Sequence, residues 1–176
     1  MKKLLLCCIA IAGIVTVRAQ ADNASVKKET RKEFKKAEGY KPSYQAKESF
    51  YSDFGNLEGV AWKRTANFDE ALFTNDGKIT KAFYDNEAKL VGTITNKTFA
   101  DLPANAQAHL NSKYADYTKG KVIFFDDNEY NDTDMELYGN VFDDADNYFI
   151  EMSKDGKNIV LKVNMEGEVS YFAEVR

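Results

Sequence analysis

The sequence predicts an α+β domain in which two helices pack on one face of a curved antiparallel sheet. Two observations support this class: a helical pattern followed by short strand patterns occurs twice, and tight turns join the strands of each set. The turns Asp76-Gly77-Lys78 and Asp155-Gly156-Lys157 lie at equivalent points of the two sets. Such self-similarity indicates two copies of one supersecondary unit that share a core. We therefore expect a tandem α-β4 repeat, with copies at about residues 43–97 and 101–176.

The first copy is expected to open with a helix that Ser43 caps and Gly55-Asn56 ends. Large side chains at three- and four-residue spacing predict its buried stripe: Tyr44, Lys47, Phe50, Tyr51 and Phe54. Four strands should follow, at residues 59–65, 67–74, 78–84 and 89–96. Asn75-Asp76-Gly77 is typical of a hairpin turn. Trp62 alternates in phase with Val60, which predicts a core position on a central strand rather than a ligand surface.

The second copy is expected to begin at Asp101-Leu102-Pro103, with Asp101 as the cap, and its helix to end at Lys119-Gly120. Its predicted buried stripe is Leu102, Ala106, Leu110, Tyr114 and Tyr117. Strands should follow at residues 121–125, 135–142, 147–154, 158–164 and 168–175. This copy carries an additional acidic loop, at about residues 126–146.

The N-terminus is typical of a cleavable signal peptide. Lys2 and Lys3 precede a mostly apolar run at residues 4–17, which is shorter than the roughly 20 residues of a stable membrane span. Cleavage near Ala19 would release a chain with a polar tether at residues 20–42 and one domain at 43–176. A membrane anchor is the alternative. A lipoprotein is disfavoured because Leu6 precedes Cys7, where a small residue is required.

Cleavage changes the composition of the working chain. Residues 20–176 contain no cysteine, so this domain would enter an oxidising compartment with no disulfide to form. Loss of Lys2, Lys3 and Arg18 leaves 21 basic and 28 acidic residues, which moves the net charge from −4 to −7. This balance favours neither nucleic acid nor anionic lipid as a partner. We expect a periplasmic or secreted protein without membrane insertion after cleavage.

Few residues offer a constellation for catalysis. His109 is the only histidine, no Gly-x-Ser-x-Gly elbow occurs, and no Gly-rich phosphate cradle is present. We expect His109 to be a surface or boundary residue, no cofactor, and no enzymatic activity.

The acidic loop is the one dense cluster of polar side chains. Asp132-x-Asp134-x-Glu136 resembles the start of a calcium site, because calcium prefers several oxygen ligands on a flexible loop. However, Leu137 replaces the loop glycine of an EF-hand, and Asp143 replaces its twelfth-position glutamate. A solvated hairpin is therefore favoured over a metal site, and over a pair of glycosidase carboxylates, since no acid and base stand out.

A set of motifs resembles the PepSY-like proteins with a β-lactamase-inhibitor-like (BLIP-like) fold, which are exported proteins of Bacteroidetes. They are Phe50-x3-Phe54, Val60-x-Trp62, Phe68-x2-Ala71-x-Phe73, Asp76-Gly77, Ala82-x-Tyr84-Asp85, Leu90-Val91-x-Thr93, Leu102-Pro103 and Tyr114-x2-Tyr117. The resemblance covers about residues 43–175. The turn at 85–88 lacks the family's usual glycine, and the acidic loop is longer than usual.

The resemblance implies a tandem α-β4 repeat and a role in binding or restraining another protein of the cell envelope, with no catalytic residues to carry over. The alternative hypothesis is an envelope sensor of calcium or another small ligand that uses the acidic loop at 126–146. An unrecognised hydrolase is the third.

Overall fold

The computed structural model describes residues 41–143 and 145–175, all of which belong to one compact unit, Lys36–Arg176. The expected signal peptide at 1–19, and the expected tether at 20–42 except its last two residues, lie outside the described residues. Those two features therefore stay predictions.

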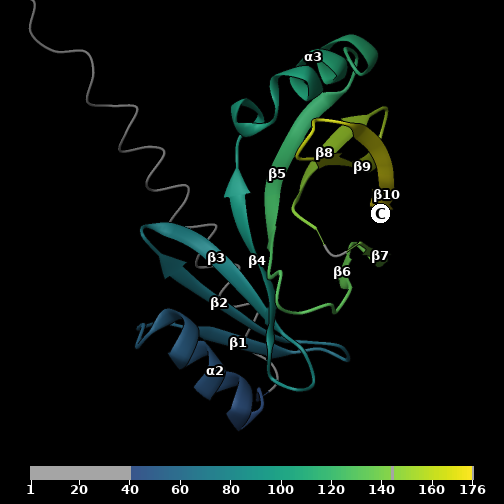
Figure 1. The fold of residues 1–176 in the computed structure, drawn as a ribbon. Helices are drawn as coiled ribbons and strands as arrows, with labels where there is room; N and C mark the ends of the chain where they lie inside the picture. Colours follow the sequence, from purple (N-terminus) through teal and green to yellow (C-terminus); the bar gives the residue numbers. More distant parts are fainter. Residues whose placement is uncertain (1–40, 144, 176) are drawn as a thin grey trace, which may run out of the picture. The chain divides into compact units, whose positions relative to one another are not determined.

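Eight strands form one antiparallel sheet in the order β1-β2-β3-β4-β5-β8-β9-β10 (Figure 1). A separate hairpin, β6–β7, lies between β5 and β8 in the chain. The predicted α+β class and antiparallel meander are confirmed. The strands are β1 (Ala61–Arg64), β2 (Asp69–Asn75), β3 (Lys78–Tyr84), β4 (Leu90–Lys97), β5 (Thr118–Asp127), β6 (Met135–Leu137), β7 (Asn140–Phe142), β8 (Asn147–Lys154), β9 (Lys157–Asn164) and β10 (Val169–Val175).

The tight turns have the backbone that their sequences predict. Asp76 and Gly77 have φ values of 48° and 75°, and Asp155 and Gly156 have 49° and 79°. Two successive positive φ values suit the right-handed twist of the strands that a hairpin joins. The two turns thereby fix the registers of β2–β3 and β8–β9.

The first described helix, α2 (Tyr44–Phe54), begins and ends where the sequence predicts. The Ser43 hydroxyl oxygen accepts a hydrogen bond from the Ala46 N–H at 3.0 Å, which satisfies one of the free donors of the first turn. At the other end, Gly55 adopts φ 79° and donates its N–H to the Tyr51 carbonyl.

The buried face of α2 is narrower than the predicted stripe. Ala46 and Phe50 are buried, and Phe54 packs beside them. Tyr44 and Tyr51 are instead 72% and 59% exposed, so their predicted burial was wrong. Side chains four residues apart share a helix face, and the row that begins at Ala46 is the one that meets the sheet.

Trp62 packs against the α2 core as predicted, with its ring centroid 5.4 Å from that of Phe50. Its strand β1, however, lies at the edge of the sheet rather than at the centre. The prediction of a central strand was wrong because β1 has a partner, β2, on one side only.

The second helix, α3 (Ala104–Lys113), follows a short 3-10 turn, η1 (Phe99–Asp101). Asp101 does not cap α3: it is the last residue of η1 and closes a capping box with the N-cap residue Thr98, whose N–H and hydroxyl donate to the Asp101 Oδ2 at 2.7 Å each. Pro103 is the N-cap residue of α3. The helix stops well before the predicted Lys119-Gly120, because the Tyr117 N–H donates to the Tyr114 carbonyl and closes a turn instead.

Both helices lie on the same face of the sheet. Cross-strand partners share a face, and one row of partners runs across the sheet from beneath α2 to beneath α3. It consists of Phe73, Thr80, Thr95, Phe124, Tyr148 and Val163. Phe73 belongs to the core under α2, and Val163 to the core under α3.

The opposite face of the sheet is covered by the β6–β7 hairpin. Its buried Met135 and Phe142 join a core with Phe125 and Phe149. The Phe142 ring lies 5.2 Å from that of Phe125 and 5.0 Å from that of Phe149. The predicted acidic loop at 126–146 therefore contains a structured hairpin that closes the second face, and the single strand expected at 135–142 is two short strands.

Candidate protein-binding surface

The middle of the helix side is a stretch of sheet between the core under α2 and the core under α3. We call it the inter-helix surface and define it by five half-buried residues, Thr93, Thr95, Lys97, Phe124 and Tyr148. They come from three strands, β4, β5 and β8. Alternation along β4 and the partners of Thr95 on β3 and β5 place all five on the face that carries the helices.

Phe124 is the unusual member of this surface. It lies on β5, in the interior of the sheet, yet it belongs to none of the three hydrophobic cores of the described residues. Its neighbours Ile123 and Phe125 point to the opposite face and are buried there. Phe124 instead packs against Tyr148 in a tilted arrangement, with ring centroids 4.7 Å apart and an interplanar angle of 43°, and the Lys97 ammonium lies 5.5 Å from the Phe124 ring.

The first half of the domain has different chemistry at the equivalent position. The pair Trp62–Ala71 on β1 and β2 is equivalent to the pair Val122–Ile150 on β5 and β8. Two residues further along these strands, the pair Arg64–Asp69 is therefore equivalent to the pair Phe124–Tyr148.

Asp69 is 2% exposed. Its carboxylate accepts from Arg64 Nε at 2.8 Å and from a terminal Arg64 nitrogen at 2.9 Å. It also accepts from the Ser43 N–H and hydroxyl, at 3.0 and 2.8 Å. An ion pair that holds the start of α2 thus corresponds to an aromatic pair in the second half.

A hollow of about 420 Å³ adjoins the inter-helix surface on the side of α2. Phe54, Thr80 and Leu90 line it together with Thr93 and Thr95. Asp126 stands at its edge, and burial and the nearby Asp146 carboxylate raise the pKa of the Asp126 carboxyl, while Lys97 opposes the shift.

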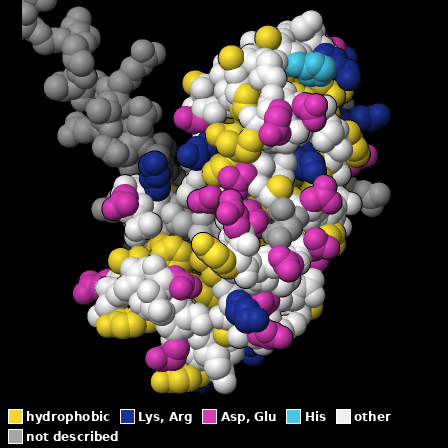
Figure 2. Space-filling model, in the orientation of Figure 1, with side chains coloured by type: hydrophobic (Ala, Val, Ile, Leu, Met, Phe, Trp, Pro, Cys, Tyr) yellow, Lys and Arg dark blue, Asp and Glu magenta, His cyan; other side chains and the backbone are white. Residues whose placement is uncertain are grey.

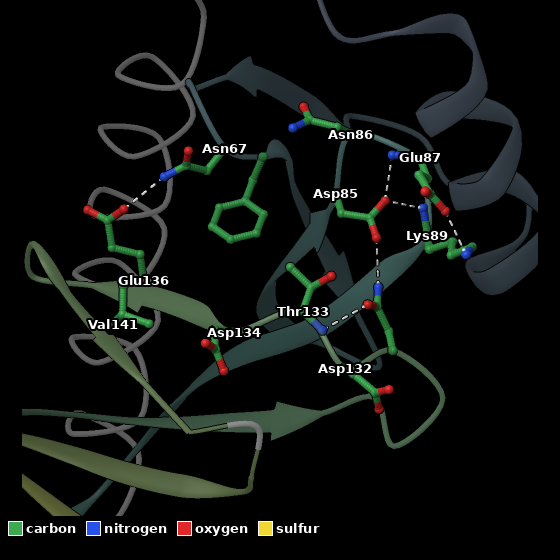
Figure 3. A pocket seen from close by; sticks show the side chains of 12 residues that line it. Asn67, Asp85, Asn86, Glu87, Lys89, Asp132, Thr133, Asp134, Glu136 and Val141 are labelled. Carbon is green, nitrogen blue, oxygen red and sulfur yellow. Dashed lines mark hydrogen bonds and ion pairs between the residues drawn. The ribbon is translucent and has the colours of Figure 1, made fainter.

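A second hollow, of about 620 Å³, lies between the turn at 85–89 and the segment that leads to β6 (Figure 3). Asp85 holds this region together. One of its carboxylate oxygens accepts from the Glu87 and Lys89 N–H groups at 2.8 and 2.9 Å, and the other from the Asn131 amide at 3.0 Å. Asn131 is 7% exposed and also donates to the Leu90 carbonyl. These hydrogen bonds join the two loops, so the Asp85 carboxylate and the Asn131 amide, which line the hollow, have a structural role.

The three residues of the calcium alternative line this second hollow without forming a ligand set. Asp132 and Asp134 are exposed, and Glu136 accepts a hydrogen bond from the Asn67 amide at 2.8 Å. Within residues 41–143 and 145–175, no three His, Cys, Asp or Glu side chains are grouped so as to hold a metal ion. His109 is exposed on α3, as predicted, with its ring 6.4 Å from that of Tyr114.

None of the residues of the inter-helix surface was identified from the sequence as a functional candidate. Phe124 lies in the apolar run Val122–Phe125, which shows no alternation because both faces of β5 carry large apolar side chains there. The one available signal was an aromatic excess on β5 and β8, and it does not distinguish a core side chain from a surface one.

In the part of the chain that the structure describes, no helix has the length and hydropathy needed to cross a bilayer.

The order helix, four sheet strands, helix, four sheet strands, with all eight strands in one antiparallel sheet, defines an α+β class of known architecture. Comparison with solved structures finds it in a BLIP-like protein from Bacteroides fragilis, with a TM-score of 0.59, 18% identity, and coverage of 78% of this chain and 89% of that one. A DUF2874 family protein from Bacteroides uniformis gives a TM-score of 0.63 and 15% identity, over 77% of this chain and 91% of the other.

A protein from Bacteroides eggerthii that carries a provisional periplasmic name is also similar, with a TM-score of 0.61, 18% identity, and coverage of 78% and 91%. No known sequence family and no curated protein matches this chain. The likeness to the solved structures concerns the fold, and it confirms the BLIP-like architecture that the sequence motifs indicated. The PepSY-like part of that resemblance stays a prediction.

Proposed function

We propose that this chain is an exported, periplasmic module that binds another protein through its inter-helix surface and performs no catalysis. The observation that carries the proposal is the Phe124–Tyr148 pair. Phe124 lies in the middle of the sheet but belongs to none of the three cores of the described residues, and its ring contacts that of Tyr148 at a tilted angle. Aromatic side chains are enriched at protein interfaces because they bury a large apolar area at a low entropic cost.

The form of the surface supports a protein rather than a small molecule as the ligand. The five residues lie on three adjacent strands, and two of them, Thr93 and Thr95, also line the hollow beside Phe54. Threonine hydroxyls and the Lys97 ammonium surround the aromatic pair, as in an interface with an apolar centre and a polar rim. Enclosed, mostly apolar pockets are instead typical of small-molecule sites.

The proposal of no catalysis rests on what the candidate groups do. His109 is exposed on α3, Asp85 is engaged in loop hydrogen bonds, and Asp69 holds Arg64 and Ser43. The periplasmic location rests on the predicted signal peptide and on the periplasmic name of the Bacteroides eggerthii protein of similar fold.

The experiment is capture of a partner from envelope extract with a photo-activated cross-linker placed on the inter-helix surface. We compare the unaltered mature chain with Phe124→Ser and with Thr95→Arg, which adds bulk on the neighbouring strand. Tyr130→Ser is the control, because Tyr130 is 94% exposed and lies in the loop after β5. We expect one partner to be captured by the unaltered chain and the control, and to be lost from both surface variants. Capture of the same partner at unchanged yield by both surface variants would overturn the proposal, as would the absence of any partner.

A further inference from the structure

We infer that the inter-helix surface, extended toward η1, receives a short acidic segment of the partner protein, with Lys97 and Lys119 as the groups that recognise its carboxylates. This inference rests on the proposed function and adds the chemistry of the bound segment. The relevant residues form what we call the lysine–aromatic patch: Lys97, Phe99, Lys119, Phe124 and Tyr148.

Each of the two lysines is positioned by an aromatic ring. The Lys97 ammonium lies 5.5 Å from the centroid of Phe124, and the Lys119 ammonium lies 4.8 Å from that of Phe99. A ring attracts the cation through its negative face but accepts none of the three N–H groups in a strong hydrogen bond. The ammonium groups are therefore held in place and still able to donate to a carboxylate.

The two lysines share the face that carries the helices. Lys97 pairs with Val122, and Lys119 pairs with Met152, and both partners belong to the core under α3. Neither lysine has a carboxylate within ion-pair distance among the described residues, in contrast to Lys154, which pairs with Asp116 beside the same helix. The patch thus presents two ammonium groups that no ion pair within the described part of the domain occupies.

The surroundings limit the length of the anionic segment. Lys97 contributes to a lowered pKa at Asp101, whose main cause is hydrogen bonding from Thr98, and it opposes the raised pKa at Asp126. Asp101 is bonded to Thr98, the residue after Lys97, and Asp126 pairs with Thr93, four residues before Lys97 on the same strand. A long anionic chain that continued past Lys97 would therefore meet Asp101 on one side or Asp126 on the other. A segment with one or two acidic residues at its centre fits this arrangement.

The same charges disfavour a polyanion or an anionic membrane. The full chain has a net charge of −4, the expected mature chain has −7, and acidic side chains are gathered near the middle of the face that Figure 2 shows. Long-range repulsion would weaken the approach of a nucleic acid, an acidic polysaccharide or an anionic bilayer. A short acidic peptide contributes few charges, and its intervening side chains can pack on Phe124 and Tyr148.

The test uses the mature chain and two fluorescent peptides, one with two central glutamates between apolar residues and one with glutamines in their place. We expect the glutamate peptide to bind more tightly, and its affinity to fall as salt concentration rises. Lys97→Gln and Lys119→Gln should each weaken that binding about fivefold, the upper range for an ion pair at a partly exposed site. Lys162→Gln is the control, since Lys162 pairs with Phe149 and so lies on the opposite face.

Equal affinity for the two peptides, no binding of either, or an equal loss in the Lys162→Gln control would overturn the inference. Tighter binding of heparin or of vesicles rich in anionic lipid, lost in the same lysine variants, would also overturn it in favour of a polyanion. If cross-linking at the inter-helix surface still captures a partner while the peptides show no preference for glutamate, the inference fails and the proposed function stands.

Discussion

The two halves of this domain pack the same architecture with different side chains. Under α2 the sheet alternates small and very large residues, Ala71 and Ala82 beside Phe73, Tyr84 and Trp62. Under α3 the equivalent positions carry residues of middle size, Ile150 and Leu161 beside Met152, Val163 and Val122. The helices follow suit, because Ala46 and Phe50 on α2 correspond to Ala106 and Leu110 on α3.

The comparison shows that close packing constrains the sum of volumes in a layer rather than the residue at each position. The polar positions differ more sharply. Arg64 and Asp69 form an ion pair in the first half, whereas of their counterparts Tyr148 packs against the core under α3 and Phe124 belongs to no core of the described residues. A difference of this kind between equivalent positions separates side chains that hold the fold from those that do not.

The largest effect is expected at the centre of the aromatic core. Phe50→Ala should cost about 3–5 kcal/mol of unfolding free energy, because the Phe50 ring contacts Phe54, Trp62 and Phe73 at centroid distances of 5.2, 5.4 and 4.8 Å. Leu110→Ala, at the equivalent place on α3, should cost about 2–4 kcal/mol. Urea denaturation measures both values. A larger loss for Leu110→Ala than for Phe50→Ala would break the comparison.

The next effect concerns the exchanged pair. Asp69→Asn should cost about 1.5–3 kcal/mol, because the nearly buried side chain loses its charge and one of the two oxygens that accept from Arg64 and Ser43. Phe124→Ser should cost less than about 1 kcal/mol, since this ring lies outside the cores. Thermal unfolding of the two variants in the same buffer measures both losses of unfolding free energy. Equal losses would show that Phe124 has a structural role.

Glycine substitutions on neighbouring strands offer a third comparison. A Cβ at Gly92 on β4 would lie 2.6 Å from both the Asp126 carbonyl oxygen and the Phe125 ring, so Gly92→Ala should cost about 1–3 kcal/mol. At Gly120 on β5 the nearest atom, the Glu151 carbonyl oxygen, is 3.1 Å away. Gly120→Ala should therefore cost less. Melting temperatures that rank the two variants in the reverse order would contradict the described packing of Phe125 on Gly92.

The smallest effect is electrostatic. Burial and Asp146 raise the pKa of Asp126, so folding favours its protonated form. The ionised form therefore destabilises the native state at neutral pH, and this penalty disappears as the pH falls below the ordinary aspartate pKa. At pH 7, Asp126→Asn should raise the unfolding free energy by less than about 0.5 kcal/mol, which appears as a slightly higher melting temperature. At low pH the substitution should leave the melting temperature unchanged. Stabilisation that grew toward low pH would have the wrong sign.

The sequence predicts the strands best where turn chemistry is strong. The expected strands 78–84 and 147–154 match β3 and β8 in full, because Asp-Gly turns define their ends. The predicted second helix is longer than α3, because Tyr114 and Tyr117 continue the helical spacing in the sequence. In the structure these two residues lie in a turn, with their ring centroids 5.4 Å apart. The inter-helix surface could not be predicted, because membership of a face depends on cross-strand partners such as Thr95 and Phe124, which are far apart in sequence.

The ladder between β4 and β5 joins the two halves through the pairs from Gly92↔Asp127 to Lys97↔Val122. The inter-helix surface includes this junction, with Thr95 on β4 and Phe124 on β5. A partner bound there would contact both halves of the domain. Because any ligand that binds only the folded state stabilises it by mass action, the whole sheet, rather than one half, would gain in resistance to unfolding and to proteolysis.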